Sequence, residues 1–185
     1  FNTFEWARFW EAHSHSRYCG TDLCDFLSAT PSSGHGFHLI ASPSHWESSA
    51  IPSKGHHLNF DLEAYQWQDR KKIDTSIMAP SDGEMVAVDE ERIFVLGSLT
   101  SDWWSTGAMY DSSEDEWTYN MSSFTKFKLS SPHLTVMSNG KILITGGGYS
   151  TVDGTRPYEY ADIYDPDTQT FRSIGVNPVS SRVIA

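Results

Sequence analysis

The sequence predicts an all-β protein built from repeated units of four short antiparallel strands. Three observations support this prediction: two segments align without a gap at an offset of 49 residues, turn-forming residues recur at equivalent positions, and aromatic residues make up 14% of the chain. The apolar runs are short and are separated by Gly, Asn, Asp and Ser, which favour turns between strands. With 185 residues, the chain is long enough to bury a core.

The clearest repeat relates residues 86–97 to residues 135–146. Each segment contains a short apolar stretch, a polar turn, a basic residue, an apolar run and a glycine. Asn139-Gly140 is a strong signal for a two-residue hairpin turn, because both residue types tolerate positive φ. We therefore expect Ile93–Leu96 and Ile142–Thr145 to be equivalent second strands of two units.

The third and fourth strands follow the same repeat. Tyr110 and Tyr164 lie in the predicted third strands, and each is followed seven residues later by a large aromatic residue, Trp117 or Phe171. Turn formers separate each tyrosine from its aromatic partner. We expect the two tyrosines to be equivalent, and the later aromatics to pack between neighbouring units.

A weaker third copy is predicted upstream. Phe37–Ala41 would be its second strand and Leu62–Tyr65 its third strand. The residue seven positions after Tyr65 is Lys72, which is not aromatic. This copy is therefore degenerate or misaligned.

Units of four strands with a period near 50 residues are typical of a β-propeller, in which blades stack because no blade buries its own faces. The residues resemble the kelch-repeat family, whose pattern has a glycine doublet after an apolar strand, then a Tyr and a Trp. Gly146-Gly147, Tyr164 and Phe171 match this pattern in one copy. In the other copy Gly97-Ser98, Tyr110 and Trp117 match it with the second glycine lost.

The resemblance implies kelch-type blades, of which two to three are present. The predicted units are an N-terminal extension or partial blade over 1–35, a degenerate blade over 36–78, kelch-like blades over 79–127 and 128–175, and the start of a truncated blade over 176–185. Propellers close with about four to eight blades. The ring would therefore close through missing chain segments or through oligomerisation, and a β-sandwich is the alternative fold.

Three connections of the predicted blades combine aromatic and hydrogen-bonding side chains. They run over 42–57, 98–106 and 149–160, between the second and third strands, and we expect all three on one face. The candidate ligand-binding residues in them are Trp46, Asp102, Trp103, Trp104, Arg156 and Tyr158. Aromatic rings beside carboxylates and a guanidinium suit stacking on sugar rings. The alternative is that the two adjacent tryptophans pack against neighbouring loops.

These features predict a non-catalytic binding module for a glycan or protein partner, with no cofactor. A galactose-oxidase-like copper radical oxidase is the alternative, because such enzymes also have kelch-type propellers. That resemblance implies a Cys cross-linked to a Tyr, a second Tyr and two His around copper. Tyr18-Cys19-Gly20 is similar to the cysteine segment, but residues 78–83 lack the expected partner Tyr. We therefore predict no catalytic or metal-binding residues, and copper enters only under this alternative.

Cysteine and histidine residues are concentrated near the N-terminus. Cys19 and Cys24 have a spacing compatible with a small disulfide loop, and two reduced thiols are the alternative. Seven of the eight histidines lie in the first 57 residues. His13 and His15 with Cys19 could form a metal site, but we interpret the histidines as isolated residues in loops.

The chain is acidic, with 13 Lys and Arg against 24 Asp and Glu, a net charge of −11. This charge disfavours nucleic acids and anionic membranes as partners, and no apolar run reaches the roughly 18 residues of a membrane span. The acidic segments 89–91 and 114–116 are interpreted as solvated turns. The sequon Asn120-Met121-Ser122, the proposed disulfide and the low lysine content favour an extracellular over a cytoplasmic location.

Overall fold

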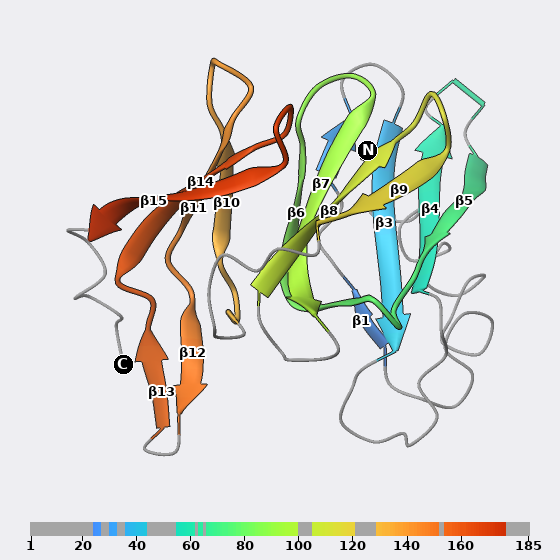
Figure 1. The fold of residues 1–185 in the computed structure, drawn as a ribbon. Coiled ribbons are helices and arrows are strands. Elements are labelled where there is room, and N and C mark those ends of the chain that lie inside the picture. Colours follow the sequence, from blue (N-terminus) through green and yellow to red (C-terminus); the bar gives the residue numbers. More distant parts are fainter. Residues whose placement is uncertain are drawn as a thin grey trace.

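The computed structural model describes residues 24–26, 30–32, 36–43, 55–61, 63–64, 66–99, 105–120, 129–151 and 154–176. These residues form an all-β structure in which three antiparallel sheets lie side by side (Figure 1). Each sheet contains a path of four strands taken in chain order. The prediction of an all-β chain with four-stranded antiparallel units is therefore confirmed.

The strands divide among the sheets as follows. The first sheet contains β1 (Cys24–Phe26), β2 (Thr30–Ser32), β3 (Gly36–Pro43), β4 (Gly55–Asp61) and β5 (Gln66–Ile73). The second sheet contains β6 (Met78–Ala87), β7 (Arg92–Leu99), β8 (Ser105–Asp111) and β9 (Glu116–Tyr119). The third sheet contains β10 (His133–Val136), β11 (Ile142–Thr145), β14 (Tyr160–Asp165) and β15 (Thr170–Val176). A separate hairpin of β12 (Gly148–Thr151) and β13 (Gly154–Pro157) is inserted between β11 and β14.

The pairing of the first strand is irregular in each of the three sheets. In the first sheet, β1 and β2 pair with two successive parts of β3, so this sheet begins before residue 36. In the second sheet, the pairing of β6 with β7 shifts between Ala79 and Glu84. In the third sheet, an isolated bridge joins Ser130 to Gly148 before regular pairing begins at His133. The three sheets thus share an irregularity as well as an order of strands.

The second and third sheets have identical registers in their first two strands. Residue pairs from Glu84↔Leu96 to Ala87↔Ile93 recur 49 residues later as His133↔Thr145 to Val136↔Ile142. The predicted equivalence of Ile93–Leu96 and Ile142–Thr145 as second strands is therefore confirmed.

The predicted aromatic pairs are also confirmed in these two sheets. Tyr110 pairs with Trp117 across β8 and β9, and Tyr164 pairs with Phe171 across β14 and β15. Trp117 packs with residues of the first sheet, and Phe171 packs with residues of the second. Each later aromatic thus lies between neighbouring sheets, as expected.

The prediction for the first sheet was wrong in its third strand. That strand is β4, which ends at Asp61, and Glu63 and Ala64 form the turn that follows it. The equivalent aromatic pair is Phe60 with Trp67. Phe60 takes the place of tyrosine here, so an alignment anchored on a tyrosine misses this copy.

The turn after each third strand is closed in the same way. An aspartate follows the aromatic residue, and its Oδ1 accepts hydrogen bonds from the main-chain N–H groups two and three positions later. These aspartates are Asp61, Asp111 and Asp165. Such side-chain bonds satisfy main-chain N–H groups in the turn that have no partner in the sheet. The repeating unit therefore includes the sequence aromatic-Asp, with a second aromatic residue six positions after the aspartate.

Two buried layers hold the sheets together. The layer between the first and second sheets includes Ile40 and Ile73 from the first sheet with Val95 and Trp117 from the second. The layer between the second and third sheets includes Phe94, Leu96, Met109, Ile142, Ile144 and Tyr164. Successive residues of a strand point to opposite faces of its sheet, so Val95 lies in the first layer and Phe94 in the second. The second sheet is therefore buried on both faces.

Candidate functional site

The predicted binding residues divide between described and undescribed parts of the chain. Trp46, Asp102, Trp103 and Trp104 lie outside the described residues, so their role stays a prediction. The described members are Arg156 in β13 and Tyr158 just after it. Figure 1 shows the β12–β13 hairpin projecting from the lower edge of the third sheet, the edge at which β3 and β7 also end.

The connection over 149–160 was expected to be a loop and is instead largely a hairpin. Gly146 and Gly147 lead into it with φ of 66° and 77°, a region that favours glycine. Tyr149 pairs with Arg156 across the hairpin. The main-chain N–H of Tyr158 donates a hydrogen bond of 3.0 Å to the main-chain oxygen of Gly147. The glycine doublet therefore turns the chain out of the sheet and fixes the base of the hairpin.

Arg156 and Tyr158 have different environments. Arg156 is exposed. Tyr158 is buried, and its hydroxyl donates a hydrogen bond of 2.6 Å to Oδ2 of Asp162, which is also buried. Burial and this carboxylate raise the pKa of Tyr158 above its usual value. Tyr158 therefore anchors the hairpin and does not offer the exposed ring that the sequence suggested.

Tyr160 offers the exposed ring at this position instead. Its side chain is 49% exposed, and its ring centroid lies 5.7 Å from that of Tyr158. Sequence reasoning missed Tyr160 because it placed this residue at the end of a loop. No signal in the sequence separates the two residues, because Tyr158 and Tyr160 would share one face of a regular strand.

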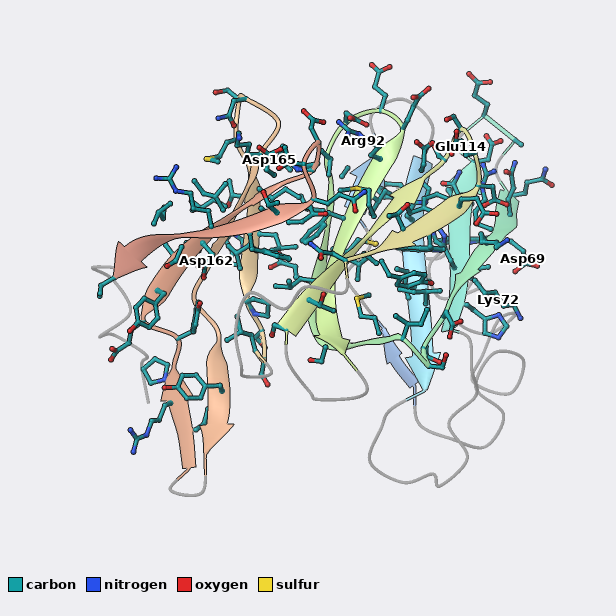
Figure 2. All side chains as sticks on the ribbon, in the orientation of Figure 1. Asp69, Lys72, Arg92, Glu114, Asp162 and Asp165 are labelled. Atoms are coloured by element: carbon teal, nitrogen blue, oxygen red, sulfur yellow. The ribbon has the colours of Figure 1, made fainter. Side chains whose placement is uncertain are left out.

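The opposite edge of the sheets carries the acidic turns. Arg92, Glu114 and Asp165 lie along this edge in Figure 2. Arg92 bonds to Asp89 at 2.8 Å and to Asp167 of the third sheet at 3.2 Å. Lys141 forms an ion pair with Asp165 and lowers the pKa of that carboxyl. These contacts pair several of the acidic residues with cations or main-chain N–H groups, in keeping with their interpretation as turns.

A buried histidine pair lies between the first and second sheets. Nδ1 of His38 in β3 and Nε2 of His57 in β4 are 2.9 Å apart and share a hydrogen bond. Both side chains are buried, with 3% and 1% exposure. The interpretation of the histidines as isolated loop residues was wrong for these two. Sequence reasoning missed them because neither lies in a motif with ligand spacing.

Aromatic and charged groups surround the histidine pair. The ring of His57 meets that of Tyr110 edge-on with centroids 4.3 Å apart, and meets that of Trp117 at 5.3 Å. The Tyr110 hydroxyl donates to Asp115 at 2.7 Å. Burial, and secondly the Arg70 cation, lower the pKa of His38 to about 4. Burial, and secondly His38, lower the pKa of His57 to about 3.

The described residues contain no group of three or more His, Cys, Asp or Glu side chains arranged to hold a metal ion. Over the same ranges, no helix is long and apolar enough to cross a membrane. Cys19 lies outside these ranges, so the disulfide with Cys24 stays a prediction.

No protein-family model matches the sequence, and no curated protein matches it significantly.

Proposed function

We propose that the chain forms part of a kelch-type β-propeller that acts as a non-catalytic binding module for a glycan or protein partner. The observation that carries this proposal is the register shared by the second and third sheets. Equal registers direct the connections between second and third strands to one edge, so residues far apart in sequence can contribute to one site. Propellers commonly carry their ligands on such connections, because loops on a rigid scaffold can vary without loss of the fold.

The arrangement of the first strands supports a propeller. β6 contacts β2 and β3 of the first sheet and β10 of the third. Innermost strands around a common axis would have these neighbours. Adjacent sheets also pack face to face through apolar layers, as successive blades do.

The outer face of the third sheet is the place where another blade would pack. Ile174 on this sheet is 51% exposed. Leu143 and Ile163 occupy the positions that Phe94 and Met109 hold in the second sheet, where they are buried against the third. The covering blade would come from further chain segments or from another copy.

The ligand proposed for the edge that carries the connections between second and third strands is uncharged or weakly charged. The chain's net charge of −11 repels anionic partners. Arg156 and Tyr160 supply an exposed guanidinium and an exposed ring on the described part of the face. Trp46, Trp103 and Trp104 would add stacking surfaces from the other two connections.

The test compares wild type with a Trp103→Ala/Trp104→Ala double variant on a glycan array and on a peptide library. Each aromatic contact contributes about 0.5–1.5 kcal/mol, so loss of two should weaken binding by roughly fivefold or more. Binding confined to one of the two libraries identifies the ligand class. Unchanged binding by a folded double variant would reject the site.

Arg156→Ala provides a second test within the described structure, and Arg172→Ala is its matched control. Both arginines are exposed, but Arg172 lies in β15 of the third sheet and not in the hairpin. We expect only Arg156→Ala to reduce binding. Native mass analysis of the full chain would also show whether copper is bound, which would favour the oxidase alternative.

A further inference from the structure

The two layers between the sheets are built on the same positions but with different chemistry. In the second sheet, Phe94 pairs with Met109 and Leu96 pairs with Gly107 on the face toward the third sheet. In the first sheet the equivalent pairs, on the face toward the second sheet, are His38 with Asn59 and Ile40 with His57. The turn aspartates Asp61 and Asp111 fix this equivalence.

The histidines take the volume that one phenylalanine fills in the other layer. A Cβ atom on Gly107 would lie 2.3 Å from Cε2 of Phe94, so the phenylalanine occupies the space above this glycine. Phe94 then stacks on Tyr164 with ring centroids 4.5 Å apart. In the first layer, His57 replaces the glycine, His38 replaces the phenylalanine, and both rings contact Tyr110, the equivalent of Tyr164. One layer is thus titratable at a position where the other is apolar.

We propose that the His38–His57 pair makes the contact between the first and second sheets more acid-sensitive than the contact between the second and third sheets, where the histidine, His133 beside Glu84, is largely exposed. A hydrogen bond between two imidazoles needs one unprotonated nitrogen as acceptor. A first added proton places a charge in a buried layer, and a second removes the acceptor and breaks the bond. Mild acid therefore loosens the first sheet from the second.

Among the groups that face the pair, the Arg70 cation disfavours an added proton, whereas the Asp115 carboxylate favours one on His57. On β5, Arg70 lies opposite His57 in the strand register, and its Nε is buried without a hydrogen-bond partner. On β8, Tyr110 presents its ring to His57, and its hydroxyl is bonded to Asp115. Asp115 already accepts hydrogen bonds from the Tyr110 hydroxyl and from the main-chain N–H of Lys71.

The remaining charged groups near the pair lie at its edges. Asp111 ends β8 and bonds to its own turn through Ser113. Lys71 directs its ammonium to Glu116 at 2.9 Å. His57 Nδ1 is buried without a hydrogen-bond partner, although the main chain of Lys71 favours the charged form of His57. None of these groups supplies a second acid to balance a doubly protonated pair.

Hydrogen exchange on the full chain between pH 7 and pH 4.5 tests the proposal. After correction for intrinsic exchange, protection in β4 and β5 should fall at least about tenfold between pH 6.5 and pH 5, because the opened state takes up protons that the closed state excludes. Protection in β11 and β14 should change less than that. An equal fall in both regions would overturn the proposal.

A His38→Asn/His57→Gln variant removes titration but keeps hydrogen-bonding atoms near Nδ1 and Nε2. It should lose the acid-dependent fall in protection, while His56→Gln on the same strand should retain it. Persistence of the fall in a folded double variant would contradict the inference.

If the double variant does not fold, the proposal is tested by following the imidazole chemical shifts of His38 and His57 in the wild-type protein as the pH is lowered. His38 and His57 should stay neutral at pH 5 in molecules that remain closed. Titration of both rings near pH 6.5 with protection unchanged would overturn the inference.

Discussion

Trp117 Nε1 donates a hydrogen bond of 2.7 Å to the main-chain oxygen of Lys71, which ties the last strand of the second sheet to the last strand of the first. The same indole packs in the buried layer between these sheets. Its equivalent in the first sheet, Trp67, is only half-buried. The same position of the repeat is therefore buried between two sheets in the second sheet and only half-buried in the first.

Trp117→Ala should destabilise the protein by about 3–5 kcal/mol, the usual cost of truncating a large buried aromatic residue. Trp117→Phe keeps most of the packing and should lose about 0.5–1.5 kcal/mol through the missing hydrogen bond. Urea unfolding followed by circular dichroism measures both. Trp67→Ala is the matched control and should cost less than Trp117→Ala; equal losses would show that burial between the sheets is not the cause.

Gly107→Ala should destabilise the layer between the second and third sheets. The added methyl would lie 2.3 Å from the ring of Phe94, which is fully buried and cannot move aside freely. Overpacking of this kind costs about 1–3 kcal/mol. Adding Phe94→Leu in the same chain should recover part of the loss, as measured by thermal unfolding. Additive losses in the double variant would exclude a direct clash.

Gly147→Ala should be more damaging than Gly146→Ala. Both glycines have positive φ, which costs an L-residue about 1–2 kcal/mol. A Cβ on Gly147 would also lie 2.8 Å from the main-chain oxygen of Ser130, whereas one on Gly146 meets nothing within 4 Å. Denaturant unfolding of the two variants gives the comparison. Equal stabilities would show that the bridge from Ser130 to Gly148 adjusts without cost.

The turn aspartates should produce a second acid transition below that of the histidines. Hydrogen bonds from Ser113, together with those from main-chain N–H groups, hold the pKa of Asp111 below its usual value. The unfolded chain therefore binds more protons than the native protein once the pH falls below about 4, and stability declines with pH there. Asp111→Asn should flatten this decline, as measured by unfolding between pH 4.5 and pH 2.5. The response between pH 6.5 and pH 5 should be unaffected.

The repeat could be predicted where the chain kept its length between equivalent residues. Ile93 and Ile142 are 49 residues apart with no insertion between the first two strands, so aligning the two segments predicted that they are equivalent second strands, and their pairing registers agree. Tyr110 and Tyr164 could be matched despite the inserted hairpin because the aspartate and the later aromatic follow each at equal distances.

Other features needed the three-dimensional structure. The first sheet was misaligned because Phe60 replaces tyrosine, although Phe60-Asp61 with Trp67 keeps the spacing. The β12–β13 hairpin was missed although Asp153-Gly154 is a sequence signal for a tight turn. The histidine pair could not be found from spacing, because His38 and His57 meet only through the pairing of β3 with β4 and the packing of the next sheet. Burial of a polar residue depends on such distant contacts.

The packing of each described sheet against its sequence neighbours makes the protein nearly one-dimensional in its energetics. The stability of such an array is approximately the sum of the stability of each unit and of each contact between neighbours. Strands within a sheet follow one another closely in sequence, so each unit can form early without long-range chain closure. A change confined to one layer should then weaken cooperativity at a single junction, and the protein would unfold in two steps separated at that junction.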